Sequence, residues 1–277
     1  MDRTLHAPTP FTRFVALGDS QTEGIGDPDG MGGFRGWADR FATLLAASTP
    51  DVHYANLAVR GRLAARIRAE QLAPALALRP DLATVMAGMN DLVRPSFAMD
   101  ATLADIEAMI TALRAVGAHV VTFTYPDIGA ITPIARPLSG RIRAMNAAVR
   151  TLAARHAVTL VDFEPVAATT HRRVWAEDRL HLSPLGHDLV ARALADTLRL
   201  PGADSTWRNP LPAEQRGVDA LLAAEFRWTA YHFAPWVARR LHGRSSGDVI
   251  TAKRPTLTPV HPHPPAAQRA ETLDAQH

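Results

Sequence analysis

Cysteine is absent from the 277-residue chain, which excludes disulfides, thiolate metal sites and cysteine nucleophiles. Long apolar runs are also missing, because no stretch approaches the roughly 20 apolar residues of a membrane-spanning helix. The first ten residues contain no apolar core of signal-peptide length. We therefore expect a cytoplasmic protein without a transmembrane segment.

The chain also has little net charge, because basic and acidic residues nearly balance. The formal net charge is +3, and Lys253 is the only lysine among cations that are otherwise arginine. No long basic run occurs in the first 200 residues, so we expect no nucleic-acid partner. The hydrophobic fraction of 47% and the charged fraction of 21% are typical of a globular protein with a sizeable core.

Five apolar segments alternate with five helix-like segments along the first 200 residues. We predict strands at Thr12–Leu17, Asp51–Leu57, Leu82–Ala87, Ala118–Thr124 and Val158–Phe163. We predict helices at Trp37–Ala47, Leu63–Leu78, Thr102–Val116, Leu138–His156 and Pro184–Leu198. Since such crossovers join parallel strands, the pattern indicates an α/β fold, a three-layer α/β/α sandwich with a flavodoxin-like five-stranded parallel sheet.

Polar residues and glycines stand where the predicted strands end. Ser20 follows the first strand, Gly61 the second and Asn90 the third, and the segment after the fifth strand reaches Asp178 and His181. The carboxyl ends of parallel strands lie at one edge of a sheet, where open α/β folds bind their ligands. Residues far apart in the sequence can therefore meet at this edge.

These residue types match the needs of nucleophilic catalysis. A serine hydroxyl such as that of Ser20 needs a base, which His181 can supply, and Asp178 lies close enough in sequence to orient the His181 ring. The amides of Ser20 and Gly61 and the side chain of Asn90 can donate to the negative oxygen of a carboxyl ester under attack.

Each of these residues also has a structural alternative. Ser20 could cap the following turn, and Asn90 could hold its own turn. Asp178–His181 could be a structural pair. For Asp19 and Asp91 we favour the structural role, as carboxylates that accept hydrogen bonds from local amides.

His187 could be imagined with Asp178 and His181 as a metal cluster. The spacing matches no short metal motif, and a serine mechanism needs no metal. We therefore predict no metal and no cofactor. The glycine-rich segment 24–36 is either a flexible surface loop or the rim of the substrate pocket, and it has no dinucleotide-binding spacing.

Four blocks together carry a family resemblance: Gly18-Asp19-Ser20, the Gly61 turn, Gly88-Met89-Asn90-Asp91 and Asp178-Arg179-Leu180-His181. In this order they resemble the SGNH/GDSL hydrolases over about residues 11 to 200. The resemblance implies a flavodoxin-like sandwich and ester hydrolysis through an acyl-enzyme. It implies Ser20 as nucleophile, Asp178 and His181 as the other triad members, and Ser20, Gly61 and Asn90 as oxyanion donors. One small departure is Gln21, where the family motif has leucine, a substitution that the family pattern tolerates at that position.

The last third of the chain differs in composition. We predict a hydrolase domain over 11–200, a helical extension over 201–250 and a disordered tail over 251–277 rich in proline, alanine and histidine. Aromatic residues precede Arg239-Arg240 in the extension. They could pack on the hydrolase domain, or form a weak contact with a partner or an anionic membrane surface.

The sequence thus predicts a serine esterase or lipase that acts on a small-molecule ester. Three alternatives remain open: an acyltransferase, a carbohydrate deacetylase with the same site, and a non-catalytic binding module. Neither the acyl and alcohol groups of the substrate nor the oligomeric state has a recognisable sequence pattern.

Overall fold

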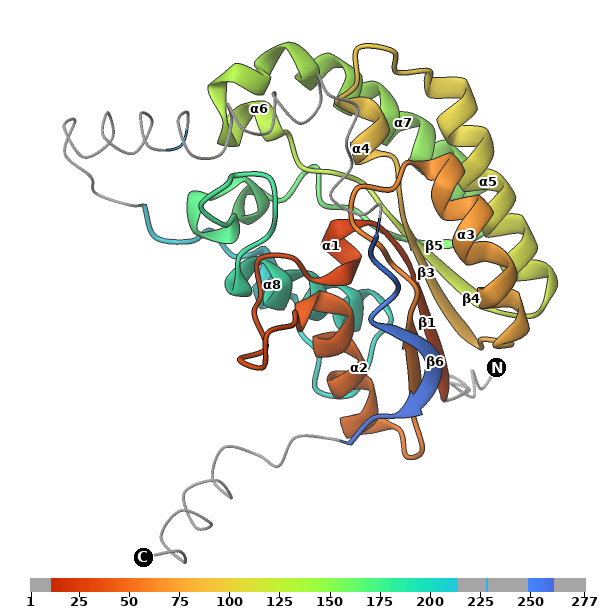
Figure 1. The fold of residues 1–277 in the computed structure, drawn as a ribbon. Helices are drawn as coiled ribbons and strands as arrows, with labels where there is room; N and C mark the ends of the chain where they lie inside the picture. The colour runs from red at the N-terminus through yellow and green to blue at the C-terminus, as the bar shows by residue number, and fades with distance from the viewer. Residues whose placement is uncertain (1–10, 214–227, 229–248, 262–277) are drawn as a thin grey trace, which may run out of the picture.

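A six-stranded sheet forms the centre of the protein (Figure 1). The computed structural model describes residues 11–213, 228 and 249–261. In the order β5-β4-β3-β1-β2-β6, neighbouring strands are hydrogen-bonded, and all except β6 run parallel. The strands are β1 Arg13–Gly18, β2 His53–Asn56, β3 Leu82–Met86, β4 His119–Phe123, β5 Thr159–Val161 and β6 Arg254–Pro259. The predicted α/β class and the five predicted parallel strands are confirmed.

Helices cover both faces of this sheet, as strands buried on both sides require. The helices are α1 Ser20–Glu23, α2 Gly36–Ser48, α3 Ala64–Ala77, α4 Met89–Leu92, α5 Met99–Ala115, α6 Ile128–Ile131, α7 Ser139–Arg155 and α8 Pro184–Thr197. Figure 1 shows α2 and α8 on one side of the sheet and α3, α5 and α7 on the other. Within the described ranges, no helix is long and apolar enough to cross a membrane.

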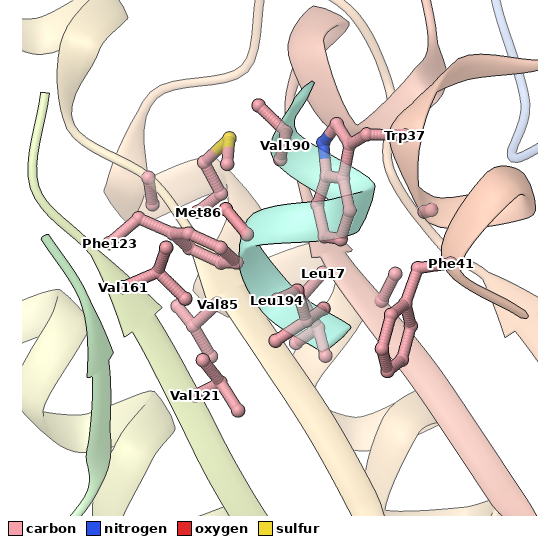
Figure 2. Packing of buried hydrophobic residues seen from close by; sticks show 14 of the residues in the cluster. Leu17, Trp37, Phe41, Val85, Met86, Val121, Phe123, Val161, Val190 and Leu194 are labelled. Atoms are coloured by element: carbon pink, nitrogen blue, oxygen red, sulfur yellow. The ribbon is translucent and has the colours of Figure 1, made fainter. Parts of the chain in front are cut away.

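The layer between the sheet and the α2–α8 pair is packed with large apolar side chains (Figure 2). Trp37 and Phe41 point from α2, and Val190 and Leu194 from α8, toward the strands. The Trp37 ring meets the Phe123 ring of β4 edge-on, with centroids 5.4 Å apart. This packing fixes α8, and with it the turn that precedes it, against the sheet.

The sixth strand corrects one sequence expectation. Residues 251–277 are predicted to be a disordered tail, but Arg254–Pro259 pairs antiparallel with β2, with Tyr54 opposite Thr258. Lys253, just before β6, donates hydrogen bonds to Phe34 O at 2.8 Å and to Arg35 O at 2.7 Å. The prolines within β6 lack N–H donors and hide its strand character in the sequence, but an outermost strand tolerates them.

The helical extension predicted over 201–250 is described only in part. Residues 205–208 form a 3-10 turn that places the buried Trp207 against Phe163. The Trp207 indole donates to Asp196 Oδ2 at 2.8 Å, so this beginning of the extension packs on the sandwich. Residues 214–227 and 229–248 of the predicted extension lie outside the described residues, and the domain boundaries stay a prediction.

Candidate active site

Ser20 is the first residue of α1, directly after β1. Asp19 caps α1, because its Oδ1 accepts a hydrogen bond from Gln21 N at 3.2 Å. The strand must turn sharply here: a Cβ at Gly18 would lie 2.3 Å from Thr22 Oγ1 and 2.9 Å from Met86 O. Only glycine fits, and the Ser20 N–H at the start of α1 belongs to the donors that a helix leaves without an intrahelical partner.

Asp178 and His181 form a close pair in the turn before α8. His181 Nδ1 lies 2.6 Å from Asp178 Oδ2, while Asp178 Oδ1 accepts from the backbone N–H groups of Leu180 and His181, each at 3.0 Å. Burial alone would raise the pKa of Asp178, but the hydrogen bond and charge of His181, together with the two amides, lower it to about 2. The carboxylate therefore stays ionised and can orient the ring.

The Ser20 and His181 segments are joined by the side chain of Gln21. Its Nε2 donates to Leu180 O at 2.7 Å, and its Oε1 accepts from Leu182 N at 3.2 Å. The structure shows no hydrogen bond between the Ser20 hydroxyl and the His181 ring. Such bonds are often long in unliganded enzymes and tighten when substrate binds. The structure thus brings the predicted nucleophile and base to the same sheet edge.

The other two predicted oxyanion donors lie on neighbouring turns. Gly61 follows β2 with φ +76°, in the left-handed region that favours glycine. Asn90, on α4, donates from Nδ2 to Asp19 Oδ2 at 3.0 Å and to Arg62 O at 3.1 Å. Both Nδ2 hydrogens are thus bonded within the protein.

Asp19 accepts a hydrogen bond from a local amide as expected, whereas Asp91 accepts one from an amide far along the chain. Burial raises the pKa of Asp19 to about 6, and Asn90 and Gln21 N are its hydrogen-bond donors. Asp91 Oδ2 accepts from Ala64 N at 3.0 Å, at the start of α3. Since α3 has no capping side chain of its own, Asp91 supplies the cap from α4.

An ion pair that the sequence did not indicate links α1 to the Gly61 turn. Glu23, with 5% of its side chain exposed, forms a salt bridge with Arg60 and accepts from Arg60 N at 2.7 Å. The guanidinium also lies 5.3 Å from the centre of the Phe34 ring. The glycine-rich segment 24–36 is therefore fastened next to the site through Phe34, which Lys253 holds by its carbonyl.

One aromatic residue of the extension reaches the turn that carries His181. The Trp228 indole donates to Asp178 O at 2.8 Å, and the Arg179 guanidinium lies 4.9 Å from the centre of its ring. Trp228 therefore packs on the hydrolase domain, one of the two alternatives predicted for the aromatic segment. The adjacent residues, including Arg239-Arg240, lie outside the described residues, and the surface-binding alternative stays a prediction.

His187 has a structural role in place of the metal-binding alternative. The fully buried ring accepts from Trp37 N at Nδ1 (3.0 Å), and its Nε2 donates to Ile25 O (3.0 Å). Both nitrogens are thus occupied. Among the described residues, no three or more histidine, aspartate or glutamate side chains are grouped so that they could hold a metal ion.

Acid is expected to destabilise the fold through His187. Burial lowers the pKa of His187 to about 4. The nearby charges of Arg40 and Lys253 lower this pKa further, while that of Asp27 raises it. Between pH 6.5 and about 4, His187 binds a proton in the unfolded chain but not in the folded chain. The free energy of unfolding therefore falls as the pH falls through this range. Thermal unfolding from pH 8 to pH 4 measures this loss. The His187→Asn variant is expected to be less stable at pH 8 but to decline less with acid; equal declines would contradict the assignment.

Comparison with known proteins gives the family and the fold. Residues 16–189 match the family model described as the GDSL-like Lipase/Acylhydrolase family. A search of curated proteins finds no match. Among solved structures, a catalytic mutant of Axe2, an acetylxylan esterase from Geobacillus stearothermophilus, superposes with a TM-score of 0.60 at 19% identity, covering 70% of this chain and 97% of that one.

A second solved structure is LAE5, an alpha/beta hydrolase enzyme from the metagenome of Lake Arreo, Spain. It superposes with a TM-score of 0.57 at 20% identity, covering 67% of this chain and 94% of that one. At such identities both likenesses concern the fold, while the family model spans more than half of the chain and includes all the predicted site residues. The chain therefore belongs to the GDSL-like lipase/acylhydrolase family of ester-cleaving hydrolases.

Proposed function

We propose that the protein is a serine hydrolase that cleaves carboxylic esters through an acyl-enzyme, with Ser20, His181 and Asp178 as its triad. One observation carries the proposal: the 2.6 Å contact between Asp178 Oδ2 and His181 Nδ1 lies on a turn that Gln21 fastens beside Ser20. This arrangement leaves Nε2 of His181 as the ring atom that can act on the serine hydroxyl.

The reaction then has two halves. In the first, His181 Nε2 takes the Ser20 proton while Oγ attacks the ester carbonyl, and the same proton passes to the departing alcohol as the acyl-enzyme forms. In the second, His181 takes a proton from water, the resulting hydroxide attacks the acyl group, and Ser20 regains its proton as the acid leaves. Asp178 stays ionised throughout and stabilises the imidazolium.

The negative oxygen that forms in each half needs donors. The N–H groups of Ser20 and Gly61 and the Nδ2 of Asn90 supply them in this proposal. Asn90 exchanges a hydrogen bond with Asp19 or Arg62 for one with the oxyanion, so its gain in the transition state is a difference between two bonds.

Asn90→Ala is expected to lower kcat by about 10²-fold to 10³-fold, the usual loss when one oxyanion donor is removed. KM is expected to change little, because the donor acts on the transition state. Steady-state kinetics with a short p-nitrophenyl ester measures both constants. The control is Asn146→Ala, which removes a buried side-chain amide bonded to Tyr125 N and Tyr125 O. An unchanged kcat in Asn90→Ala would remove Asn90 from the oxyanion site.

A fluorophosphonate probe and a substrate panel test the proposed function as a whole. The probe is expected to label Ser20, located by peptide mass spectrometry, and the protein is expected to hydrolyse members of a panel of acyl esters and acetylated sugars. Acetylated sugars belong in the panel because the similar Axe2 is an acetylxylan esterase. No labelling of folded protein would favour a binding module, and a faster transfer to an added alcohol than to water would favour an acyltransferase.

A further inference from the structure

We propose that Gln21 is a positioning residue that sets the His181 base in place relative to the Ser20 nucleophile. The inference rests on the proposed function, because it deepens the account of the same site. Gln21 is also the point at which this chain departs from the leucine of the family motif. Its role follows from four hydrogen bonds that hold the backbone at His181, two of them from Gln21 and two from within the turn.

The Gln21 side-chain amide bonds to the backbone on both sides of His181. Nε2 donates to the carbonyl of Leu180 at 2.7 Å, and Oε1 accepts from the N–H of Leu182 at 3.2 Å. These two groups flank His181 and face the same side of the chain, as they do along an extended strand. The side-chain amide of Gln21 therefore makes the pair of backbone hydrogen bonds that a neighbouring strand would make.

The opposite side of His181 is held independently. Its own N–H donates to Asp178 Oδ1 at 3.0 Å, and its carbonyl accepts from Ala176 N at 2.8 Å. These two bonds stay within the 176–181 turn, so they fix the shape of the turn but not its distance from β1. Among the hydrogen bonds of the described residues, only the Gln21 pair connects the backbone on either side of His181 to the segment that carries Ser20.

The connection matters because the two segments are far apart in sequence. Gln21 is separated from Leu180 by 159 positions and from Leu182 by 161. Since Gln21 directly follows Ser20, any movement of α1 is passed to the His181 turn through two partly buried hydrogen bonds. A displacement of about 1 Å between reacting groups can cost about 10²-fold in rate.

A second tie lies further along the same segments and keeps the fold intact without Gln21. His187 Nε2 donates to Ile25 O at 3.0 Å, which joins α8 to the chain after α1. A Cβ at Gly26 would lie 2.1 Å from Leu182 O, so the two segments also pack closely there. Loss of Gln21 is therefore expected to loosen the His181 ring locally and to leave the sandwich folded.

The test compares Gln21→Met with Asn146→Leu in the full chain. Asn146 makes an equivalent pair of bonds, accepting from Tyr125 N at 2.9 Å and donating to Tyr125 O at 2.7 Å, and it is fully buried. These bonds join α7 to the chain after β4 and involve no residue of the β1–α1 turn, so Asn146→Leu controls for the loss of two hydrogen bonds. Melting temperature, kcat and KM are measured for both, with Gln21→Leu as a second variant should Gln21→Met not fold.

Gln21→Met is expected to lower kcat about 10-fold to 100-fold with KM within about threefold of the original. Asn146→Leu is expected to lower the melting temperature at least as much while keeping kcat within about threefold. A kcat near the original in Gln21→Met, or equal losses of kcat in both variants, would overturn the positioning role. If Ser20→Ala kept its turnover, the proposed function would fall as well; an inactive Ser20→Ala beside a normal Gln21→Met would overturn the positioning role alone.

Discussion

Ester hydrolysis by the Ser20→Ala variant is expected to fall by about 10⁴-fold to 10⁶-fold, the largest loss expected from any single substitution in this chain. Without Oγ no acyl-enzyme can form, and the residual rate comes from water acting in the oxyanion site. The substitution removes one oxygen from a residue that is 9% exposed and whose hydroxyl has no bond to the His181 ring. Stability should therefore stay close to that of the original chain.

The measurement is kcat/KM with short p-nitrophenyl esters, supported by loss of fluorophosphonate labelling. Ser48→Ala is a matched control, because the Ser48 hydroxyl only donates to Leu45 O at the end of α2. The control is expected to retain full activity. Turnover by Ser20→Ala within tenfold of the original would show that another group is the nucleophile.

Asp178→Asn is expected to lower kcat by about 10⁴-fold. The asparagine can keep an oxygen on the backbone amides of Leu180 and His181, so the turn should retain its shape. Its Nδ2 then faces His181 Nδ1 as a donor, which places the ring proton on Nε2. In that tautomer the ring cannot take the Ser20 proton, and it also loses the ionised partner that stabilises the imidazolium.

The measurement is kcat against pH, with Asp162→Asn as the control. Asp162 is a carboxylate of similar exposure at the end of β5, and it pairs with Arg150 rather than with a histidine. The control is expected to lose some stability and little activity. A fall of less than about tenfold in Asp178→Asn would assign the orienting role to another group.

The parts of the fold that could be predicted are those whose structure depends on residues close together in the sequence. Apolar runs marked β1 and β3 because both are buried on both faces, and Gly18 marked the turn after β1 because nothing larger fits there. The same local pattern predicted Ser20 and Asn90 just after strands and the Asp178–His181 pair in the segment that follows the fifth strand. A parallel sheet gathers its strand ends at one edge, which is why residues so far apart in sequence could be predicted to lie near one another.

What the sequence did not reveal depends on partners that lie far along the chain. The amide of Gln21 fits the backbone 159 and 161 positions away, and no local pattern encodes that match. Asn90 donates both Nδ2 hydrogens to Asp19 and Arg62, and these acceptors could be identified only from the folded structure. β6 was missed for a related reason, since its strand character comes from the β2 backbone rather than from its own proline-containing sequence.

The pairing of β6 with β2 also protects the protein from its own copies. Without β6, the outer side of β2 would present unpaired N–H and C=O groups, which can recruit a strand from another molecule and start aggregation. The prolines of β6 in turn make that strand a poor template for further pairing. A chain shortened to residues 11–200 would lose this cover together with Lys253, and the outer side of β2 would then have no partner strand.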